Sequence, residues 1–483
     1  MFELKRKTIK GIGWSFIDNI ANTGITFLVG LVLARILSPS EFGIIGMLAI
    51  FIAVANTLVD SGLSSSLIRK NDTTNTDYNT IFFFNIFIST SLYVLLFLIA
   101  PSISAFFREP ILVPVSRVLS LVLIINSFSI IQRTILIKRI DFKTQTKISL
   151  IASVSSGIIG IGMALCGNGL WSLVGQQVSR QLLNTMLLWV FNSWRPVFEF
   201  SKDSFKVHFG FGSKLLLSGL LDTLYKNVFN LIIGRFYQAD QLGQYSRAES
   251  FSGIFSSNLT GVVQRVSYPT LSSIQDDSML LRQAYRRVIK TTMFISFSCI
   301  LGLAAVSKPM IVVLIGSKWL QAAEYLPIIC LGTMLYPLHA INLNMLQVKA
   351  RSDLFLRLEV LKKAIGLIPI FLGIFIGIKA MLWGGVLTSF IAYFLNSYYS
   401  GRLINYSMKE QVMDITPSFL LSLGMAVIVH LIEVFSSMGM LSTLIIQISI
   451  GVLVVIGFSE LFRLKDYLYV KQLVTETLYR NRK

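Results

Sequence analysis

Polar side chains recur at helical spacing inside the apolar segments of this 483-residue chain. In residues 11–36 they fall three or four positions apart, which would gather them on one face of an α-helix: they are Ser15, Asp18, Asn19, Asn22, Thr23 and Thr26. Residues 211–235 show a similar pattern, with a polar side chain every four positions: Lys214, Ser218, Asp222, Lys226 and Asn230. An ionisable group costs on the order of 3 kcal/mol at the centre of a membrane-spanning helix. These faces are therefore expected to line a hydrated cavity, although Ser, Thr and Asn could instead join packed helices.

Cations within the apolar segments could bind an anionic head group, because an Arg side chain grips phosphate oxygens with paired donors. The candidates for substrate binding are Arg117, Arg180, Lys226 and Arg247. The candidates for polar contacts in the cavity, or for binding a coupling proton or Na⁺, are Asp18, Asn22, Asp222 and Glu249. Arg35 and Arg235, at the ends of their segments, are expected to be gate residues or interfacial anchors.

These assignments have structural alternatives. Asp222 and Lys226 are four residues apart, so they could neutralise each other on one helix. Arg117 and Arg247 lie within two turns of the end of a predicted span, so their charges could extend to the nearest membrane surface.

The composition indicates a membrane protein. Of all residues 54% are hydrophobic and only 14% are charged, with a mean hydropathy of +0.69, which excludes an ordinary water-soluble domain. A helix needs about 20 apolar residues to cross a hydrocarbon core of about 30 Å. About fourteen such segments are predicted, at residues 11–36, 42–64, 79–100, 111–137, 147–166, 169–191, 211–235, 242–266, 291–307, 321–347, 356–378, 381–400, 416–436 and 441–462. The fold class is thus an all-α polytopic membrane protein.

The basic residues predict the orientation. Most of the 43 Lys and Arg residues fall in loops on one side of the membrane, which places both termini in the cytoplasm. The net charge of +19 does not indicate a nucleic-acid partner, because the cations lie between apolar runs rather than on a basic face of a soluble domain.

An internal repeat divides the chain. Four residue pairs match at offsets that rise in order from 200 to 212 (235 − 35 and 383 − 171): Arg35 and Arg235, Pro101 and Pro309, Asp141 and Asp353, and Trp171 and Trp383. The first pair is followed by a matching Gly43 and Gly243. The repeat predicts two six-helix lobes, residues 1–200 and 201–405, related by a pseudo-twofold axis along the membrane normal. Residues 406–483 are expected to form two further spans and a basic cytoplasmic tail.

No motif in the sequence indicates an enzyme. His208, His339 and His430 are far apart and fit no metal or catalytic-triad spacing, so each is interpreted as an isolated buried or loop histidine. The Gly-rich stretches lie inside spans and form no phosphate-cradling loop. No metal or cofactor is expected, and a coupling proton or Na⁺ remains an open hypothesis.

Three stretches carry a family resemblance. They are "LARILSPSEFGIIGMLAIFIAVANTLVDSGLSSSLIRK" from Leu33, "FNLIIGRFYQADQLGQYSRAESF" from Phe229 and "RVSYPTLSSIQDDSMLLRQAYRR" from Arg265. The chain resembles the Wzx-type polysaccharide flippases, in their WzxC-like branch, within the multidrug, oligosaccharidyl-lipid and polysaccharide exporter superfamily.

The resemblance implies two lobes that open alternately to either side of the bacterial inner membrane. It implies translocation of undecaprenyl-diphosphate-linked oligosaccharide repeat units for exopolysaccharide, capsule or lipopolysaccharide assembly. Arg180, Lys226 and Arg247 would then hold the diphosphate while the polyprenyl tail stays in lipid, with membrane lipids and a polysaccharide polymerase as further partners. The alternatives are a drug exporter or lipid II flippase of the same superfamily, or, from another class, a membrane polysaccharide polymerase or ligase.

Overall fold

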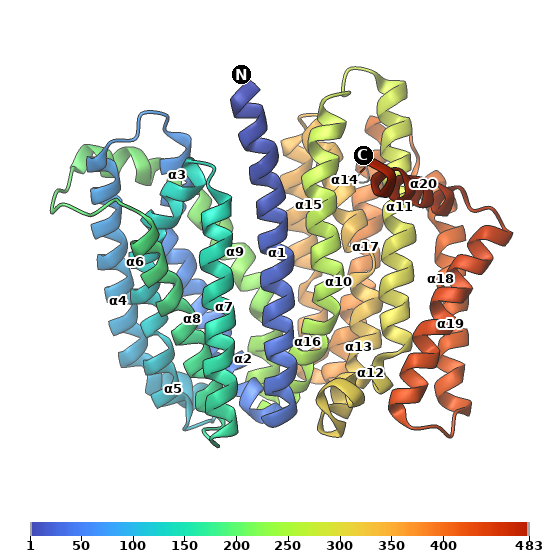
Figure 1. The fold of residues 1–483 in the computed structure, drawn as a ribbon, viewed down its shortest axis with the longest axis horizontal. Coiled ribbons are helices and arrows are strands. Elements are labelled where there is room, and N and C mark those ends of the chain that lie inside the picture. Colours follow the sequence, from blue (N-terminus) through green and yellow to red (C-terminus); the bar gives the residue numbers. More distant parts are fainter. Residues whose placement is uncertain (1, 481–483) are drawn as a thin grey trace. The chain divides into compact units, whose positions relative to one another are not determined.

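The computed structural model describes residues 2–480, with the side chains of 2–10, 12, 473, 474 and 477–480 left out of the description. The described residues contain helices and no strand. The chain forms two compact units, residues 1–243 and 244–483. Figure 1 follows the helices along the chain.

The first unit contains nine helices among its described residues. They are α1 (Phe2–Ile36), α2 (Pro39–Asp60), α3 (Leu63–Arg69), α4 (Asn75–Phe107), α5 (Leu112–Leu119), α6 (Leu121–Lys138), α7 (Phe142–Leu165), α8 (Leu170–Phe191) and α9 (Lys202–Phe236). Helix α10 (Ala239–Ser272) begins in this unit and continues into the second.

The second unit contains the remaining helices. They are α11 (Ser278–Ala305), α12 (Ser307–Ile315), the 3-10 turn η1 (Ser317–Trp319), α13 (Leu320–Thr333), α14 (Tyr336–Val348), α15 (Ser352–Ile365), α16 (Leu367–Phe375), α17 (Ile378–Leu403), α18 (Met408–Phe435), α19 (Met440–Leu461) and α20 (Lys465–Arg480).

The fourteen predicted spans all fall on helical segments. Ten helical segments of the described chain are long and apolar enough to cross a membrane. The other four predicted spans fall on α8, α9, α10 and the α15–α16 pair. Helices α9 and α10 carry charged side chains within their length, and α15 and α16 are interrupted at Gly366. The all-helical polytopic fold class is confirmed.

The start of α2 shows how the local sequence sets a helix boundary. Ser38 precedes Pro39, whose ring favours the first helical position. Ser38 and Glu41 form a capping box, in which the Glu41 carboxylate accepts the Ser38 N–H at 2.6 Å.

The internal repeat has a structural counterpart within the first unit. Helices α1 and α9 have the same length, and their bounds differ by 200 positions (202 − 2 and 236 − 36). The starts of α2 and α10 touch at the two matched glycines: a Cβ on Gly43 would overlap the carbonyl oxygen of Ala239, and a Cβ on Gly243 would overlap that of Pro39. The contact is reciprocal, as a twofold relation between the copies requires.

The packing assigns α9 to the first unit, where it lies against α2, α3 and α4. The hydroxyl groups of Thr57 on α2 and Thr223 on α9 are 3.0 Å apart. The lobe boundaries at residues 200 and 405 rest on the repeat and stay a prediction.

The C-terminal region forms two long helices and a third, shorter one. Helix α18 packs on α11 and α19, and Gln447 of α19 donates to the carbonyl of Val429 at 2.9 Å. The expected basic tail contains α20, which packs on α11 through Lys290 and Asp466, 3.5 Å apart. In Figure 1, α20 (dark red) lies crosswise to α11, on which it packs.

Candidate functional site

The polar face of α1 meets α7. Asp18 Oδ1 accepts hydrogen bonds from Asn22 Nδ2 at 2.6 Å and from Ser149 Oγ at 2.5 Å. Ser153 Oγ donates to Asn22 Oδ1 at 2.6 Å. These bonds join the two helices, so Asp18 and Asn22 serve helix packing as well as presenting a half-buried carboxylate.

A second set of polar groups joins α2, α6 and α8. Asn126 of α6 donates to Asn56 of α2 at 3.0 Å, and Gln181 of α8 donates to Asn126 at 3.1 Å. Ser129 also donates to the Asn126 side chain, at 3.1 Å. Amide and hydroxyl groups are thus satisfied across three helices in the middle of the first unit.

Two Arg side chains lie on the same helices as these amide groups. Arg133 lies seven positions after Asn126, on the same face of α6, and Arg180 directly precedes Gln181. Asp60 and Asp18 are the carboxylates that act electrostatically on Arg133, and Asp18 acts on Arg180. Both side chains are half-buried, and within the described part of the chain neither forms a hydrogen bond or an ion pair.

Arg133 is a candidate site residue that the sequence analysis missed. It lies within two turns of Lys138 and Arg139 and is therefore easily taken for one of the basic residues at a helix end. The signal that could have identified it is the spacing of Asn126, Ser129 and Arg133, which places all three on one helical face.

The other candidate cations of the first unit have different surroundings. The Arg117 guanidinium carbon is 4.2 Å from the centre of the Phe97 ring. Lys226 is exposed on α9 and forms no ion pair with Asp222 in the described part of the chain. Arg35 is exposed near the end of α1, and Arg235 donates to the carbonyl of Phe106 and lies over its ring at 4.8 Å.

Arg247 and Glu249 belong to the second unit, on α10. Arg247 is half-buried, Glu249 is exposed, and the Glu249 carboxylate accepts a hydrogen bond from the Tyr245 hydroxyl. The structure therefore brings Asp18, Asn22 and Arg180 together in the first unit and leaves Arg247 and Glu249 in the other.

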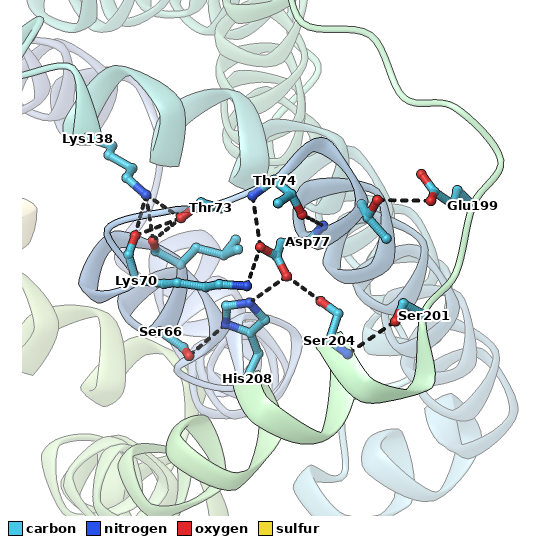
Figure 2. A network of polar contacts seen from close by, with 12 residues as sticks. Ser66, Lys70, Thr73, Thr74, Asp77, Lys138, Glu199, Ser201, Ser204 and His208 are labelled. Carbon is cyan, nitrogen blue, oxygen red and sulfur yellow. Dashed lines mark hydrogen bonds and ion pairs between the residues drawn. The ribbon is translucent and has the colours of Figure 1, made fainter.

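A separate polar network lies at the corner of α3, α4 and α9 (Figure 2). We call it the Asp77 cluster: Ser66, Lys70, Asp77, Ser204 and His208. Asp77 accepts from Lys70 Nζ at 2.7 Å and from Ser204 Oγ at 2.6 Å, and His208 Nε2 lies 3.3 Å from its Oδ1. Ser66 Oγ lies 2.8 Å from His208 Nδ1. From the sequence, His208 is interpreted as an isolated buried or loop histidine; the structure shows that it is buried and has partners.

The Asp77 cluster has the residue types of a catalytic triad, but its burial and its contacts are those of a network that stabilises the fold. Ser66, Asp77 and His208 are all buried, and the Asp77 carboxylate also caps α4 through the Thr74 N–H at 2.9 Å. Burial lowers the pKa of His208, which precedes the apolar stretch 211–235, so the imidazole is neutral at pH 7, with Nδ1 beside the Ser66 hydroxyl and Nε2 facing the Asp77 carboxylate. The cluster fastens the start of α9 to α3 and α4.

Comparisons with solved structures define the class of protein. The structure is similar to the lipid II flippase MurJ in an inward closed conformation, with a TM-score of 0.73 and 16% identity, covering 94% of this chain and 98% of that one. It is also similar to an inward-facing multidrug resistance MATE family transporter of the MOP superfamily, with a TM-score of 0.62 and 14% identity, covering 80% and 96% of the two chains. The chain thus shares its helical fold with these two membrane proteins.

The family follows from the sequence comparisons. Residues 32–324 match the family model described as polysaccharide biosynthesis protein, and the chain belongs to this family. It is 27% identical to the lipopolysaccharide biosynthesis protein WzxC of Escherichia coli (strain K12), over 74% of this chain and 73% of the relative. It is 26% identical to the teichuronic acid biosynthesis protein TuaB of Bacillus subtilis (strain 168), over 89% of each chain. The succinoglycan biosynthesis transport protein ExoT of Rhizobium meliloti (strain 1021) is 25% identical, over 68% and 66%. The resemblance to polysaccharide flippases is confirmed.

Proposed function

We propose that this chain moves undecaprenyl-diphosphate-linked oligosaccharide repeat units from the inner to the outer leaflet of the bacterial inner membrane by alternating access. Relatives named for polysaccharide biosynthesis and transport support this function, and so does a fold shared with MurJ and MATE transporters. The role is transport rather than catalysis, in exopolysaccharide, capsule or lipopolysaccharide assembly.

The observation that carries the proposal is that the Asp18 carboxylate acts electrostatically on two guanidinium groups, Arg133 of α6 and Arg180 of α8. Arg133 lies in a segment that is long and apolar enough to cross a membrane, and Arg180 lies in the predicted span 169–191. In the described chain neither has a hydrogen-bond or ion-pair partner. A desolvated cation in that position requires a counter-charge, and a diphosphate supplies two phosphates that guanidinium groups bind through paired donors. The polyprenyl tail remains in lipid because transferring it to water would expose its apolar surface.

Asp18 is our candidate for coupling, because it is the carboxylate that acts on both guanidinium groups. Substrate phosphate and the Asp18 carboxylate would compete for the same cations, so protonation of Asp18 or binding of Na⁺ there would favour the loaded state. Arg117, Lys226, Arg247, Asp222 and Glu249 remain candidate contacts along the path. Replacing Asp18 by Asn should make flipping in right-side-out vesicles independent of the ion gradient that drives the native protein.

Complementation tests the function directly. The gene should restore polysaccharide export in a strain that lacks its own repeat-unit flippase, with no change in drug sensitivity. Drug resistance without restored export would indicate a drug exporter, and rescue of a strain depleted of its lipid II flippase would indicate lipid II as substrate. If the gene restored export only in a strain that lacks its polysaccharide polymerase or ligase, the protein would be an enzyme of that class.

The cytoplasmic location of both termini and a polymerase partner are further proposals. The basic loops support the orientation. A fluorescent protein fused after Lys483 should fluoresce, and alkaline phosphatase at the same place should be inactive. Crosslinking in living cells should recover a polysaccharide polymerase encoded with the transporter.

A further inference from the structure

The segment between α8 and α9, residues 192–201, is held in a fixed position although it has no regular secondary structure. We call it the linker. Gln132 of α6 donates to the carbonyl of Trp194 at 3.1 Å, and the Val197 N–H donates to Asn79 of α4 at 3.1 Å. The Ser201 N–H donates to Thr80 at 3.1 Å. Figure 2 shows the linker passing Glu199 and Ser201 into α9, beside the Asp77 cluster.

This fixed segment exposes large apolar side chains. Phe198 is 93% exposed, Val197 65% and Phe200 54%, and Val207 in the second turn of α9 is 60% exposed. Hydrogen bonds to α4 and α6 prevent the linker from folding back to bury them. Apolar surface that is held open in this way stabilises a protein only when another apolar phase covers it.

The position of the linker relative to α4 indicates which phase this is. The Phe198 ring is 5.0 Å from the ring of Phe83, and the Phe205 ring is 4.7 Å from that of Phe84. Phe83 lies four residues inside the apolar stretch 79–100, which is about 6 Å along a helix. That depth corresponds to the boundary between lipid head groups and acyl chains, where aromatic side chains are enriched.

The charges next to these side chains fit an anionic lipid surface. Lys202 and Lys206 are exposed, one turn apart on α9, and in the described chain neither forms an ion pair or a hydrogen bond. Asp203 is the exposed acid between them, on a different face of the helix. Arg195 is already bound to the carbonyls of Trp189 and Asn192, at 2.9 and 2.7 Å.

We propose that the linker and the first two turns of α9 form a membrane-interface anchor for an anionic phospholipid leaflet. Phe198 and Phe200 enter the boundary with the acyl chains, and Lys202 and Lys206 bind lipid phosphates. The anchor is independent of the transported substrate. Through it, the connection that follows α8 is tied to the bilayer as well as to α4.

Spin labelling measures the depth of the linker. In a variant whose cysteines Cys166, Cys299 and Cys330 are replaced by Ser, a nitroxide is attached at Phe198→Cys, with Asp203→Cys as the matched control. The protein is reconstituted in phosphatidylethanolamine and phosphatidylglycerol at a ratio of about 7:3, which supplies anionic lipid. The label at 198 should collide with oxygen and be shielded from a water-soluble nickel reagent, and the label at 203 should show the reverse.

Nickel accessibility at position 198 as high as that expected at position 203 would overturn the anchor, because the linker would then lie in water. Shielding of the label at 198 from both reagents would also overturn it, since another copy of the chain would then cover this surface. The double variant Lys202→Gln/Lys206→Gln should move the label at 198 outward in the anionic vesicles and leave it unchanged in pure phosphatidylcholine. An unchanged depth in both would overturn the role of the lysines. A monodisperse size-exclusion profile checks that each variant is folded.

Discussion

Two charged clusters within the first unit differ in how completely their charges are paired. In the Asp77 cluster, the carboxylate has partners on α3, α4 and α9, and Lys70, Ser204 and the Thr74 N–H supply the donors. At Arg133 and Arg180, charge is present in two of the predicted spans without hydrogen-bond or ion-pair partners in the described chain. A fully paired network has nothing left to offer a ligand, whereas an incomplete one gains from an incoming anion.

The difference predicts opposite consequences for the same kind of substitution. Removing charge from the paired cluster should cost stability and spare transport by the protein that folds. Removing charge from the incomplete cluster should strongly reduce transport. It should spare stability, because desolvated cations without partners are themselves unfavourable in the folded protein.

The largest effect is expected for Arg133→Gln. A hydrogen bond to a charged group contributes about 1.5–3 kcal/mol, so loss of the guanidinium should lower polysaccharide export by about 10- to 100-fold. The thermal midpoint in detergent should stay the same or rise. Arg139→Gln, which removes an exposed cation from the end of the same helix, is the control and should export normally. Full export by Arg133→Gln would remove Arg133 from the site and leave the family function standing.

Asp77→Asn should show the reverse behaviour. The amide keeps the size of the side chain but loses the charge that pairs with Lys70, which should lower the free energy of unfolding by about 2 kcal/mol. Lys70 is partly exposed and can return to water, which limits the cost. Glu199→Gln, at an exposed hydrogen bond to Thr76, should change stability little. Equal thermal midpoints for the two variants would contradict the structural role of the Asp77 cluster.

The smallest effect is a dependence of stability on pH that originates at His208. Because burial lowers the pKa of His208 in the folded protein, the unfolded chain binds a proton more readily. The stability is present above the ordinary histidine pKa of about 6.5 and is lost as the pH falls below it. In the His208→Gln variant, the thermal midpoint should change less between about pH 7 and pH 5 than it does in the native protein. An unaltered slope would show that other groups cause it.

The fold could be predicted because the length of an apolar run decides whether a helix can cross a membrane. All fourteen spans fall on helices for this reason, including the polar ones on α9 and α10. Periodicity could not predict which helix packs on which, because that depends on contacts distant in sequence. The packing of α9 on helices of the first unit is one example, and only the structure could show it.

The candidate site was predicted only in part. Asp18, Asn22 and Arg180 do come together, because a helical stripe of polar groups must find a polar neighbour. The partners could not be predicted, since Ser149, Ser153 and Arg133 lie on other helices. The same limit hid the Asp77 cluster: His208 looked isolated because Ser66 and Asp77 are more than a hundred positions away in the chain.

The two glycines at which α2 and α10 touch restrict how the gene can diverge. The obstacle opposite each is a main-chain carbonyl, which stays in place whatever residue occupies position 39 or 239. No second-site change of a side chain can therefore make room for a larger residue. Each helix start therefore confines the other to glycine at this point, and a larger residue at position 43 or 243 should force the two main chains apart.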